Sequence, residues 1–338
     1  MHSATGKEMA NASSLKMIDY NNNSEVQALA ARKLSEMLKK YTAELSENLP
    51  SDETVQICEY GCATGGSSIA PIKAIQEKTG KRNLKILMND LPMNDWETLK
   101  NTVEKEFPDI DFRYTAKTMY SAIAENCSIH LGYSCFAQHW LDNGAPQGLP
   151  GDALWANQLH KDCPERQSWE NASRDNWEKK LLMRAKEIVS GGMLVIHIQS
   201  SKICGNLSEN FAVTLQKAKS SMIKNKEIDL EEANAMYIPQ YCKSPAEIFN
   251  TLCTPKISSL WQLEEAHYEQ LPCDILFDQK NINKQIKFLQ GFMNSTLACS
   301  MTETQLAKFW GHVTRIAQSD VEALTSNGMS TFICLKRL

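Results

Sequence analysis

A glycine-rich turn follows an apolar segment early in the chain. Residues 59–68 read EYGCATGGSS, after the apolar-leaning run 55–58 and before a helix-like segment that starts at Ile69. A turn between a strand and a helix is a common binding place for phosphates and nucleosides. No Lys follows the glycines, which excludes a GxxxxGK(S/T) phosphate loop. Ala63 stands where a dinucleotide turn has its second glycine, and its Cβ disfavours close approach of a pyrophosphate.

Two acidic residues lie where a nucleoside would meet this turn. Glu59, Gly61 and Gly65 form the pattern acidic-x-Gly-x-x-x-Gly, the type of turn that binds adenosylmethionine in methyltransferases. Asp90 ends the next strand-like segment, LKILMND at 84–90, and a carboxylate in that place can accept both ribose hydroxyls. The turn alone is also compatible with a glycine turn that binds nothing. Together with Asp90 it favours a nucleoside cofactor.

Strand-like and helix-like segments alternate along the first 200 residues. The strand-like runs are residues 55–60, 84–88, 110–114, 128–133 and 193–198, and helical spacing marks 25–45, 69–78, 95–107 and 169–189. Such alternation predicts an α/β fold with a parallel sheet covered by helices on both faces. We expect the last of these helices to end at Gly191-Gly192, because glycine commonly ends helices.

The character of the sequence changes after about residue 204. Helical patches are interrupted by YIPQYCKSP at 237–245 and by CTPK at 253–256, without sustained strand alternation. This pattern predicts a mainly helical cap. The expected organisation is an N-terminal segment and helix that contribute to the active site, a cofactor-binding core, the cap with the acceptor pocket, and a C-terminal helix and strand that complete the core, at residues 1–50, 51–203, 204–292 and 293–338.

Composition narrows the class of protein. With 36 Lys and Arg against 40 Asp and Glu, the formal net charge is −4, which argues against a nucleic-acid-binding surface. No apolar run reaches 18 residues and the N-terminus does not resemble a secretory signal, so neither a membrane span nor export is expected. The eleven cysteines form no CxxC pair, which indicates reduced thiols in the cytoplasm and no metal site.

Six stretches match the motifs of one enzyme family in order and spacing. YNNNSEVQ at 20–27 matches YxxNSxxQ, EYGCATGGSS matches ADLGCSSGPN, NDLPMND at 89–95 matches LNDLPxND, and SCFAQHWLD at 134–142 matches SSYSLHWLS; AKEIVSGGMLVI at 185–196 and YIPQYCKSPAE at 237–247 follow. The chain therefore resembles the SABATH carboxyl methyltransferases, which include the salicylate, jasmonate and benzoate methyltransferases. The resemblance covers about residues 18–260.

The resemblance implies a Rossmann-like class I methyltransferase sheet with a helical cap. The implied cofactor is S-adenosylmethionine (SAM), with S-adenosylhomocysteine as product, and the implied assembly is a homodimer. By position, the cofactor contacts would be Tyr20 and Ser24 at the methionine end, Asp90 at the ribose, Leu91, Thr118 and Met119 near the adenine, and Glu59, Gly61 and Ser67 in the turn. Four of these depart from the family: Glu59 replaces Asp, Ser67 replaces Asn, and Thr118 and Met119 replace a Ser-Phe pair.

The resemblance also implies how an acceptor carboxylate is held. Gln27 and Trp140 would orient it, and His139 would stand beside them. The rest of the implied substrate pocket is Phe136, which replaces a frequent Tyr, together with Tyr237 and Ile238. Without the resemblance, Gln27 would be taken for an exposed helix residue and Trp140 for a core residue.

These observations predict an O-methyltransferase that forms the methyl ester of a small, largely apolar carboxylic acid. A carboxylic acid has a pKa of about 4 and is already an anion at neutral pH, so in-line transfer needs no general base. Two alternatives stay open. One is N-methylation of a small heterocycle, and the other is a relative that binds small molecules without catalysis.

Overall fold

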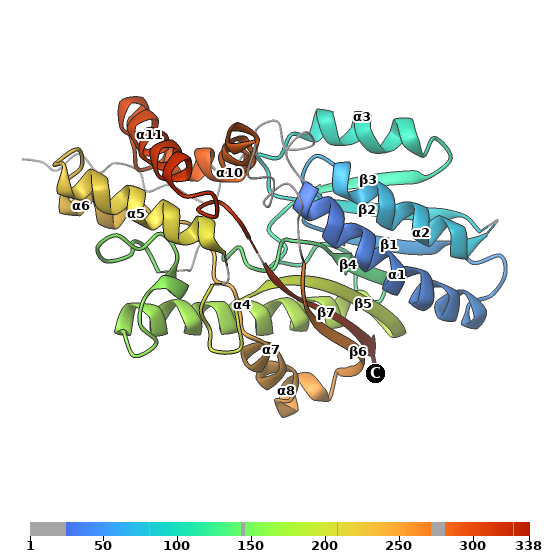
Figure 1. Cartoon of the computed structure of the whole chain (residues 1–338). Helices are drawn as coiled ribbons and strands as arrows, with labels where there is room; N and C mark the ends of the chain where they lie inside the picture. Colours follow the sequence, from blue (N-terminus) through green and yellow to red (C-terminus); the bar gives the residue numbers. More distant parts are fainter. Residues whose placement is uncertain (1–24, 81, 143–145, 208, 272–280, 327) are drawn as a thin grey trace, which may run out of the picture.

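The centre of the molecule is one mixed sheet of seven strands, ordered β3-β2-β1-β4-β5-β7-β6 (Figure 1). This computed structural model describes residues 25–80, 82–142, 146–207, 209–271, 281–326 and 328–338. The strands are β1 (Val55–Tyr60), β2 (Leu84–Asp90), β3 (Asp111–Ala116), β4 (Ile129–Ser134), β5 (Ile188–Ser200), β6 (Trp261–Gln270) and β7 (Met329–Arg337). Because β2 and β4 flank β1, the strand order reverses at β1, and a crevice for ligands opens beyond the carboxyl ends there.

Helices cover both faces of the sheet. On one face lie α1 (Glu25–Asn48), α2 (Ile69–Thr79) and α3 (Trp96–Glu106), and on the other lie α4 (Pro164–Glu187), α7 (Pro245–Leu252) and α8 (Pro255–Ser258). Alternate residues of β5 serve the two faces: Met193 and Val195 join the core under α1, while Leu194 and Ile196 join the core under α4. This explains why the strand is apolar almost throughout.

Most segments expected in the first 200 residues are present, but the sheet is not wholly parallel. β1 to β5 pair in parallel, as expected, and the C-terminal strand expected within residues 293–338 is β7. However, β7 is antiparallel to both β5 and β6. After leaving the cap, the chain enters the sheet as β7, in the position between β5 and β6. The pattern of apolar and polar residues in β7 does not indicate whether the strand runs parallel or antiparallel to its neighbours.

The glycine pair 191–192 does not end a helix. α4 ends at Glu187 and β5 begins directly at Ile188, so the glycines lie inside the strand. The register between β4 and β5 shifts there, and a Cβ on Gly192 would meet the carbonyl oxygen of His130 at 2.8 Å. Glycine at a strand irregularity lets two backbones approach closely. The expectation of a helix stop was therefore wrong, although the location of the strand was right.

A second cluster of helices forms a cap beside the sheet (Figure 1). It contains α5 (Asn210–Lys224), α6 (Leu230–Ala235), α10 (Ile282–Leu297) and α11 (Glu303–Ser319), which share one apolar core. β6, α7 and α8 fall within residues 204–292, where a helical cap was expected, yet they pack on the sheet. Conversely, α11 was expected in the core and packs against α5 in the cap. The two units therefore interleave along the chain.

No helix in the described part of the chain combines the length and apolar character needed to cross a membrane.

Candidate active site

The glycine-rich turn lies at the carboxyl end of β1 and leads through a short 3-10 helix, η3 (Gly66–Ser68), into α2. Gly61 and Gly65 both have left-handed backbones, with φ of +86° and +85°. A Cβ on Gly61 would come within 2.6 Å of Ala137 Cβ, and one on Gly65 within 2.9 Å of Leu99 Cδ1. Both glycines are required, because the turn bends sharply and packs tightly against the loop after β4 and against α3.

Asp90, at the carboxyl end of β2, faces this turn with a fixed carboxylate. The backbone N–H of Ala63 donates to its Oδ2 at 2.6 Å, and the N–H of Leu91 donates to its Oδ1 at 2.8 Å. Burial raises the pKa of the Asp90 carboxyl, while these two donors lower it. A carboxylate has about four acceptor sites, so two backbone donors orient Asp90 and leave capacity for a ligand's hydroxyls.

A pocket opens above Asp90 and the turn. Its empty space is ≈ 1030 Å³, part of it open to solvent. The lining comes mainly from the loops after the four parallel strands β1 to β4, with two residues from α10. Among the residues that line it are Gly61, Ala63, Ser67, Asp90, Leu91, Asn94, Thr118, Met119, Phe136, Trp140, Phe292 and Ser295. We call this the donor pocket.

Glu59 supports the turn from behind and is not among the residues that line the donor pocket. It is 2% exposed, and the Tyr133 hydroxyl donates to its Oε2 at 2.8 Å. Burial raises the pKa of this carboxyl to about 7, although the nearby hydroxyls of Ser68 and Tyr133 oppose the shift. The structure thus gives Glu59 a supporting place rather than a contact with a ligand in the pocket.

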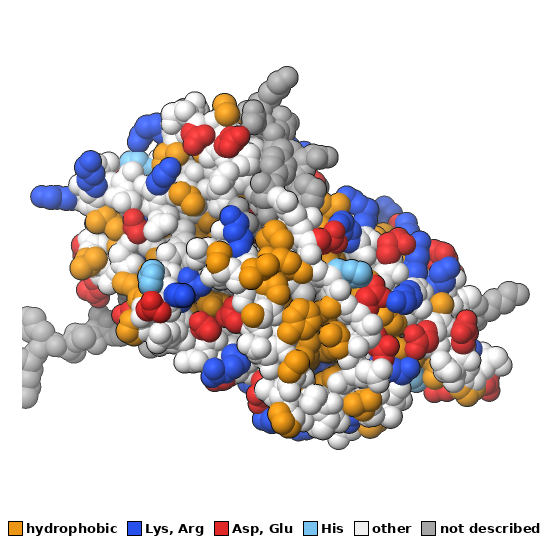
Figure 2. All heavy atoms as spheres, turned by 60° about the horizontal axis from the view of Figure 1, so that its bottom comes forward, with side chains coloured by type: hydrophobic (Ala, Val, Ile, Leu, Met, Phe, Trp, Pro, Cys, Tyr) orange, Lys and Arg blue, Asp and Glu red, His pale blue; other side chains and the backbone are white. Residues whose placement is uncertain are grey.

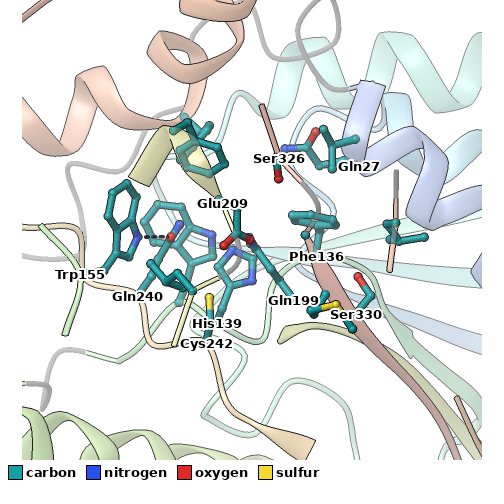
Figure 3. Close-up of a pocket in the computed structure, with 18 of the residues that line it drawn as sticks. Gln27, Phe136, His139, Trp155, Gln199, Glu209, Gln240, Cys242, Ser326 and Ser330 are labelled. Carbon is teal, nitrogen blue, oxygen red and sulfur yellow. Dashed lines mark hydrogen bonds between the residues drawn. The ribbon is translucent and has the colours of Figure 1, made fainter. Parts of the chain in front are cut away.

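A second pocket lies between the sheet and the cap (Figure 3). Its empty space is ≈ 800 Å³, also partly open. Apolar walls come from Val26, Leu207, Phe211, Leu271, Phe288, Phe292 and Met329, and polar groups from Gln27, His139, Trp155, Gln199, Glu209, Gln240, Ser326 and Ser330. Among the described lining residues there is no Lys or Arg. We call this the acceptor pocket.

Three aromatic residues belong to both pockets: Phe136, Trp140 and Phe292. Phe136 has a left-handed backbone with φ of +57°, a strained conformation for a bulky residue. Its N–H donates to Nδ1 of His197 at 3.2 Å, and the two rings lie 4.8 Å apart. His197 is itself fixed by Ser330, whose Oγ lies 2.9 Å from Nε2. A buried histidine in β5 therefore holds the wall between the pockets.

Gln27 and His139 supply polar groups of the acceptor pocket. Gln27 is 5% exposed, and its Oε1 has no hydrogen-bond partner among the described residues. His139 Nδ1 likewise has none there. Burial, together with the nearby charge of Lys243, lowers the pKa of His139 to about 3. His139 is therefore neutral near pH 7, and both side chains face the pocket as uncharged hydrogen-bonding groups.

Comparison with known proteins shows which family the chain belongs to. The family model described as "SAM dependent carboxyl methyltransferase" matches residues 10–338. The chain belongs to this family. It is 26% identical over 278 residues to methyltransferase FUS9 of Gibberella fujikuroi, covering 76% of this chain and 73% of that protein. It is 26% identical to gibberellic acid methyltransferase 2 of Arabidopsis thaliana, covering 68% and 67%.

The fold agrees with this family. A solved structure of loganic acid methyltransferase with S-adenosylhomocysteine superposes with a TM-score of 0.81 and 19% identity, covering 96% of this chain and 98% of that one. This confirms the class I methyltransferase fold predicted from the sequence. Together with the family match, it shows that the protein is a SAM-dependent methyltransferase.

The donor pocket fits SAM. Asp90 presents an acceptor-only carboxylate of the kind that binds ribose hydroxyls, and Leu91 and Met119 offer apolar walls of the kind that an adenine needs. Met119 Sδ lies 3.3 Å from Gln138 Nε2, so the flexible thioether is held in place. Gly61, Ser67 and Thr118, which the sequence analysis expects to contact the cofactor, line the same pocket. Tyr20 and Ser24, the residues expected at the methionine end, lie outside the described residues.

The acceptor side of this methyltransferase agrees with the sequence only in part. Gln27, Phe136, His139 and Trp140 come together in one pocket, as expected. Tyr237 and Ile238 are not among its lining residues. Ile238 is fully buried in the cap core, and Tyr237 packs on Trp169 with ring centroids 5.5 Å apart.

Two residues farther along the same segment line the pocket instead, namely Gln240 and Cys242. Gln240 forms an antiparallel bridge with Trp140, and its Oε1 accepts a hydrogen bond from Trp155 Nε1 at 3.0 Å. The choice of 240 over 237–238 follows from this pairing, which joins segments 100 residues apart. No local pattern in the sequence carries it.

Sequence reasoning also missed Gln199, Glu209 and Phe292. Gln199 follows the apolar run of β5, and polar residues at the carboxyl ends of parallel strands are a usable signal for a site. Glu209 immediately precedes α5, and nothing in its surrounding sequence sets it apart. Phe292 lies on α10 and reaches both pockets only through the packing of the cap.

Proposed function

We propose that the protein transfers the methyl group of SAM to the carboxylate of a small, largely apolar carboxylic acid. The observation that carries this proposal is the place of Gln27 and Trp140. Both line the acceptor pocket, and Trp140 also lines the donor pocket, so an acid held by them lies next to the donor. The Gln27 amide and the Trp140 indole N–H are neutral donors that suit a carboxylate.

The chemistry requires orientation more than proton transfer. Bound SAM supplies a methyl group on a positively charged sulfur. The acid is an anion above a pH of about 4, so it attacks without a base, and His139, with a pKa of about 3, is a poor one. Orienting the carboxylate so that one of its oxygens can attack in line supplies several kcal/mol. Gln27 and Trp140 would hold the carboxylate in this orientation.

The aromatic walls shared by the two pockets favour the transfer itself. Opposite charges on carboxylate and sulfonium disappear during the reaction, so the apolar walls formed by Phe136 and Phe292 do not penalise the transition state. An Arg or Lys clamp would stabilise the anionic ground state more than the transition state. The described lining of the acceptor pocket holds neither residue.

The test is a transfer assay with methyl-labelled SAM and a panel of aromatic, terpenoid and fatty acids. We expect label in the organic extract that is released by mild base, because esters hydrolyse under these conditions. Base-stable label on a heterocycle would instead indicate N-methylation. Binding of SAM in calorimetry without transfer to any acceptor would indicate a relative that binds without catalysis. The homodimer and the cytoplasmic location stay predictions, and size-exclusion chromatography tests the first.

A further inference from the structure

Glu209 brings a carboxylate into the acceptor pocket. It is 3% exposed and is the N-cap residue of α5, on the cap side of the pocket. Figure 3 shows its side chain pointing into the pocket next to Gln199, whose Nε2 donates to Glu209 Oε1 at 3.1 Å. Neither the methyl donor nor the carboxylate end of the acceptor explains this group.

The backbone around Glu209 is held by distant segments. Glu209 forms an antiparallel bridge with Ser326, which itself lines the pocket. The next residue, Asn210, donates from its backbone N–H to the carbonyl of Thr325 at 3.1 Å and from Nδ2 to Thr325 Oγ1 at 2.7 Å. The start of α5 is thereby fixed to the chain entering β7. Glu209 is presented by a rigid support, as a recognition group requires.

Charge and hydrogen bonding define what this carboxylate can recognise. An ionised carboxylate only accepts hydrogen bonds and offers about four acceptor sites, of which the donor from Gln199 occupies one. It repels another carboxylate, and no Lys or Arg among the described lining residues offsets that repulsion. The acid group of the acceptor is therefore directed to Gln27 and Trp140. The group of the acceptor that faces Glu209 must be a hydrogen-bond donor.

The remaining walls of the pocket indicate the chemical character of the acceptor between its carboxylate and the group that faces Glu209. Leu207, Phe211 and Phe288 are apolar and line the same pocket on the cap side. An acceptor that fills the pocket therefore has an apolar middle, with polar groups matched to Gln27 and Glu209. Burying an unmatched polar group in such a pocket costs free energy, which turns Glu209 into a selective contact.

We propose, on the basis of the function proposed above, that the acceptor is a hydroxylated carboxylic acid whose hydroxyl donates a hydrogen bond to Glu209. The hydroxyl and the carboxyl stand at opposite ends of an apolar body. Gln199 is a positioning residue that orients the Glu209 carboxylate. The protein should accordingly discriminate between acids that differ only by this hydroxyl.

The experiment compares matched acids: octanoic acid with its terminal hydroxyl and terminal amino derivatives, and phenylpropanoic acid with its ring-hydroxylated derivatives. For the wild-type protein we expect kcat/KM to be higher for the hydroxylated member of at least one pair, by about 10- to 100-fold, the range for a hydrogen bond to a charged group. Glu209→Leu should reduce this ratio to about one, and Glu209→Gln should reduce it partly, because an amide oxygen still accepts.

Matched controls separate recognition from folding. Glu231 is an exposed carboxylate on α6 outside both pockets, and Glu231→Leu should leave the ratio unchanged. Calorimetric affinity for SAM, measured for every variant, reports whether the donor side is intact. If Glu209→Leu does not fold, Glu209→Gln carries the test, because it keeps the shape of the side chain.

The outcomes distinguish the two proposals. If the wild-type protein esterifies the unsubstituted acids as well as the hydroxylated ones, the Glu209 contact is refuted while carboxyl methylation stands. The same holds if Glu209→Leu lowers kcat/KM equally for both members of a pair. A higher kcat/KM for the amino derivative would show that Glu209 recognises an ammonium group and not a hydroxyl, which would overturn the assignment. If no acid in either series is esterified, it is the proposed function itself that fails.

Discussion

The donor pocket and the acceptor pocket share a wall but are built in opposite ways. Apart from two residues of α10, the donor pocket draws on one stretch, residues 61–142, in which each loop follows the next parallel strand. The acceptor pocket draws on residues 26–330, from α1, the ends of β4 and β5, the start of α5, α10 and the start of β7. The donor pocket is thus formed mainly by consecutive segments of the chain, whereas the acceptor pocket is formed by segments that are far apart in the sequence.

This difference has a physical origin. Parallel strands carry their carboxyl ends to the same edge of the sheet, so short loops converge there without further help. Turn geometry then limits the residues that fit, as the left-handed glycines 61 and 65 illustrate. The acceptor pocket lacks this constraint. Part of its wall comes from the cap, whose helices share an apolar core of their own, separate from the cores on the two faces of the sheet.

The comparison predicts that donor binding depends on Asp90 and hardly on the cap. Asp90→Ala removes the carboxylate expected to hold two ribose hydroxyls and should weaken SAM binding by about 1,000-fold, since each bond to a charged group contributes 1.5–3 kcal/mol. Isothermal calorimetry measures this affinity.

The control is Asp95→Ala, which removes the N-cap that accepts from Thr98 N at 3.1 Å. It should lower stability by about 1 kcal/mol and leave SAM affinity unchanged. Equal SAM affinities of Asp90→Ala and the wild-type protein would contradict the prediction that donor binding depends on Asp90.

Support for the donor turn should be visible in the pH dependence of stability. The pKa of Glu59 is raised from 4.5 to about 7 in the folded state, chiefly by burial. Its contribution to stability is therefore complete below pH 4.5 and is lost as the pH rises through about 7. Relative to Glu59→Gln, the wild-type free energy of unfolding should fall by up to about 3 kcal/mol across this window. Urea denaturation at pH 5 and pH 8 measures it, and parallel pH profiles for the two proteins would contradict this account.

The two residues predicted to hold the acceptor should differ in their effect. Gln27 lines only the acceptor pocket, so Gln27→Ala should lower kcat/KM for the acid by about 30-fold and leave SAM affinity unchanged. Trp140→Ala should impair both, because its ring lines both pockets. Trp140→Phe keeps much of the wall and removes the indole N–H, so it should spare SAM affinity. Steady-state kinetics with calorimetry separates these effects, and full turnover in Gln27→Ala would remove the acceptor assignment.

The smallest expected effect concerns the pH dependence of turnover. An acid with a pKa of about 4 and a His139 with a pKa of about 3 both keep one protonation state above pH 5. We therefore expect kcat/KM for the acid to be flat between about pH 5.5 and 7.5. The measurement is a pH profile at a temperature far below unfolding. A rise in kcat/KM with an apparent pKa between 6 and 7 would reveal a general base and contradict the mechanism.

The fold could be predicted where local patterns agree with tertiary packing. The range expected for the first core strand, residues 55–60, is the range of β1, because its apolar run is buried and ends at a turn. β6 escaped prediction because its exposed edge reads WQLEEAHYEQ, with charges that also suit a surface helix. Gly192 was misjudged since a glycine that ends a helix and one that relieves a strand look alike in sequence.

The sequence alone was enough to predict the turn with Gly61 and Gly65, the place of Asp90 at the end of β2, and the family. These features depend on spacing within short segments, which a sequence displays directly. Which residues line the acceptor pocket became clear only from the tertiary structure. It replaced Tyr237 and Ile238 by Gln240, and it brought Glu209 to Gln199 through contacts of α5 with the chain entering β7. Contacts between residues far apart in the sequence produce no periodic pattern within either segment, because the pattern of each segment reflects the packing of its own helix or strand.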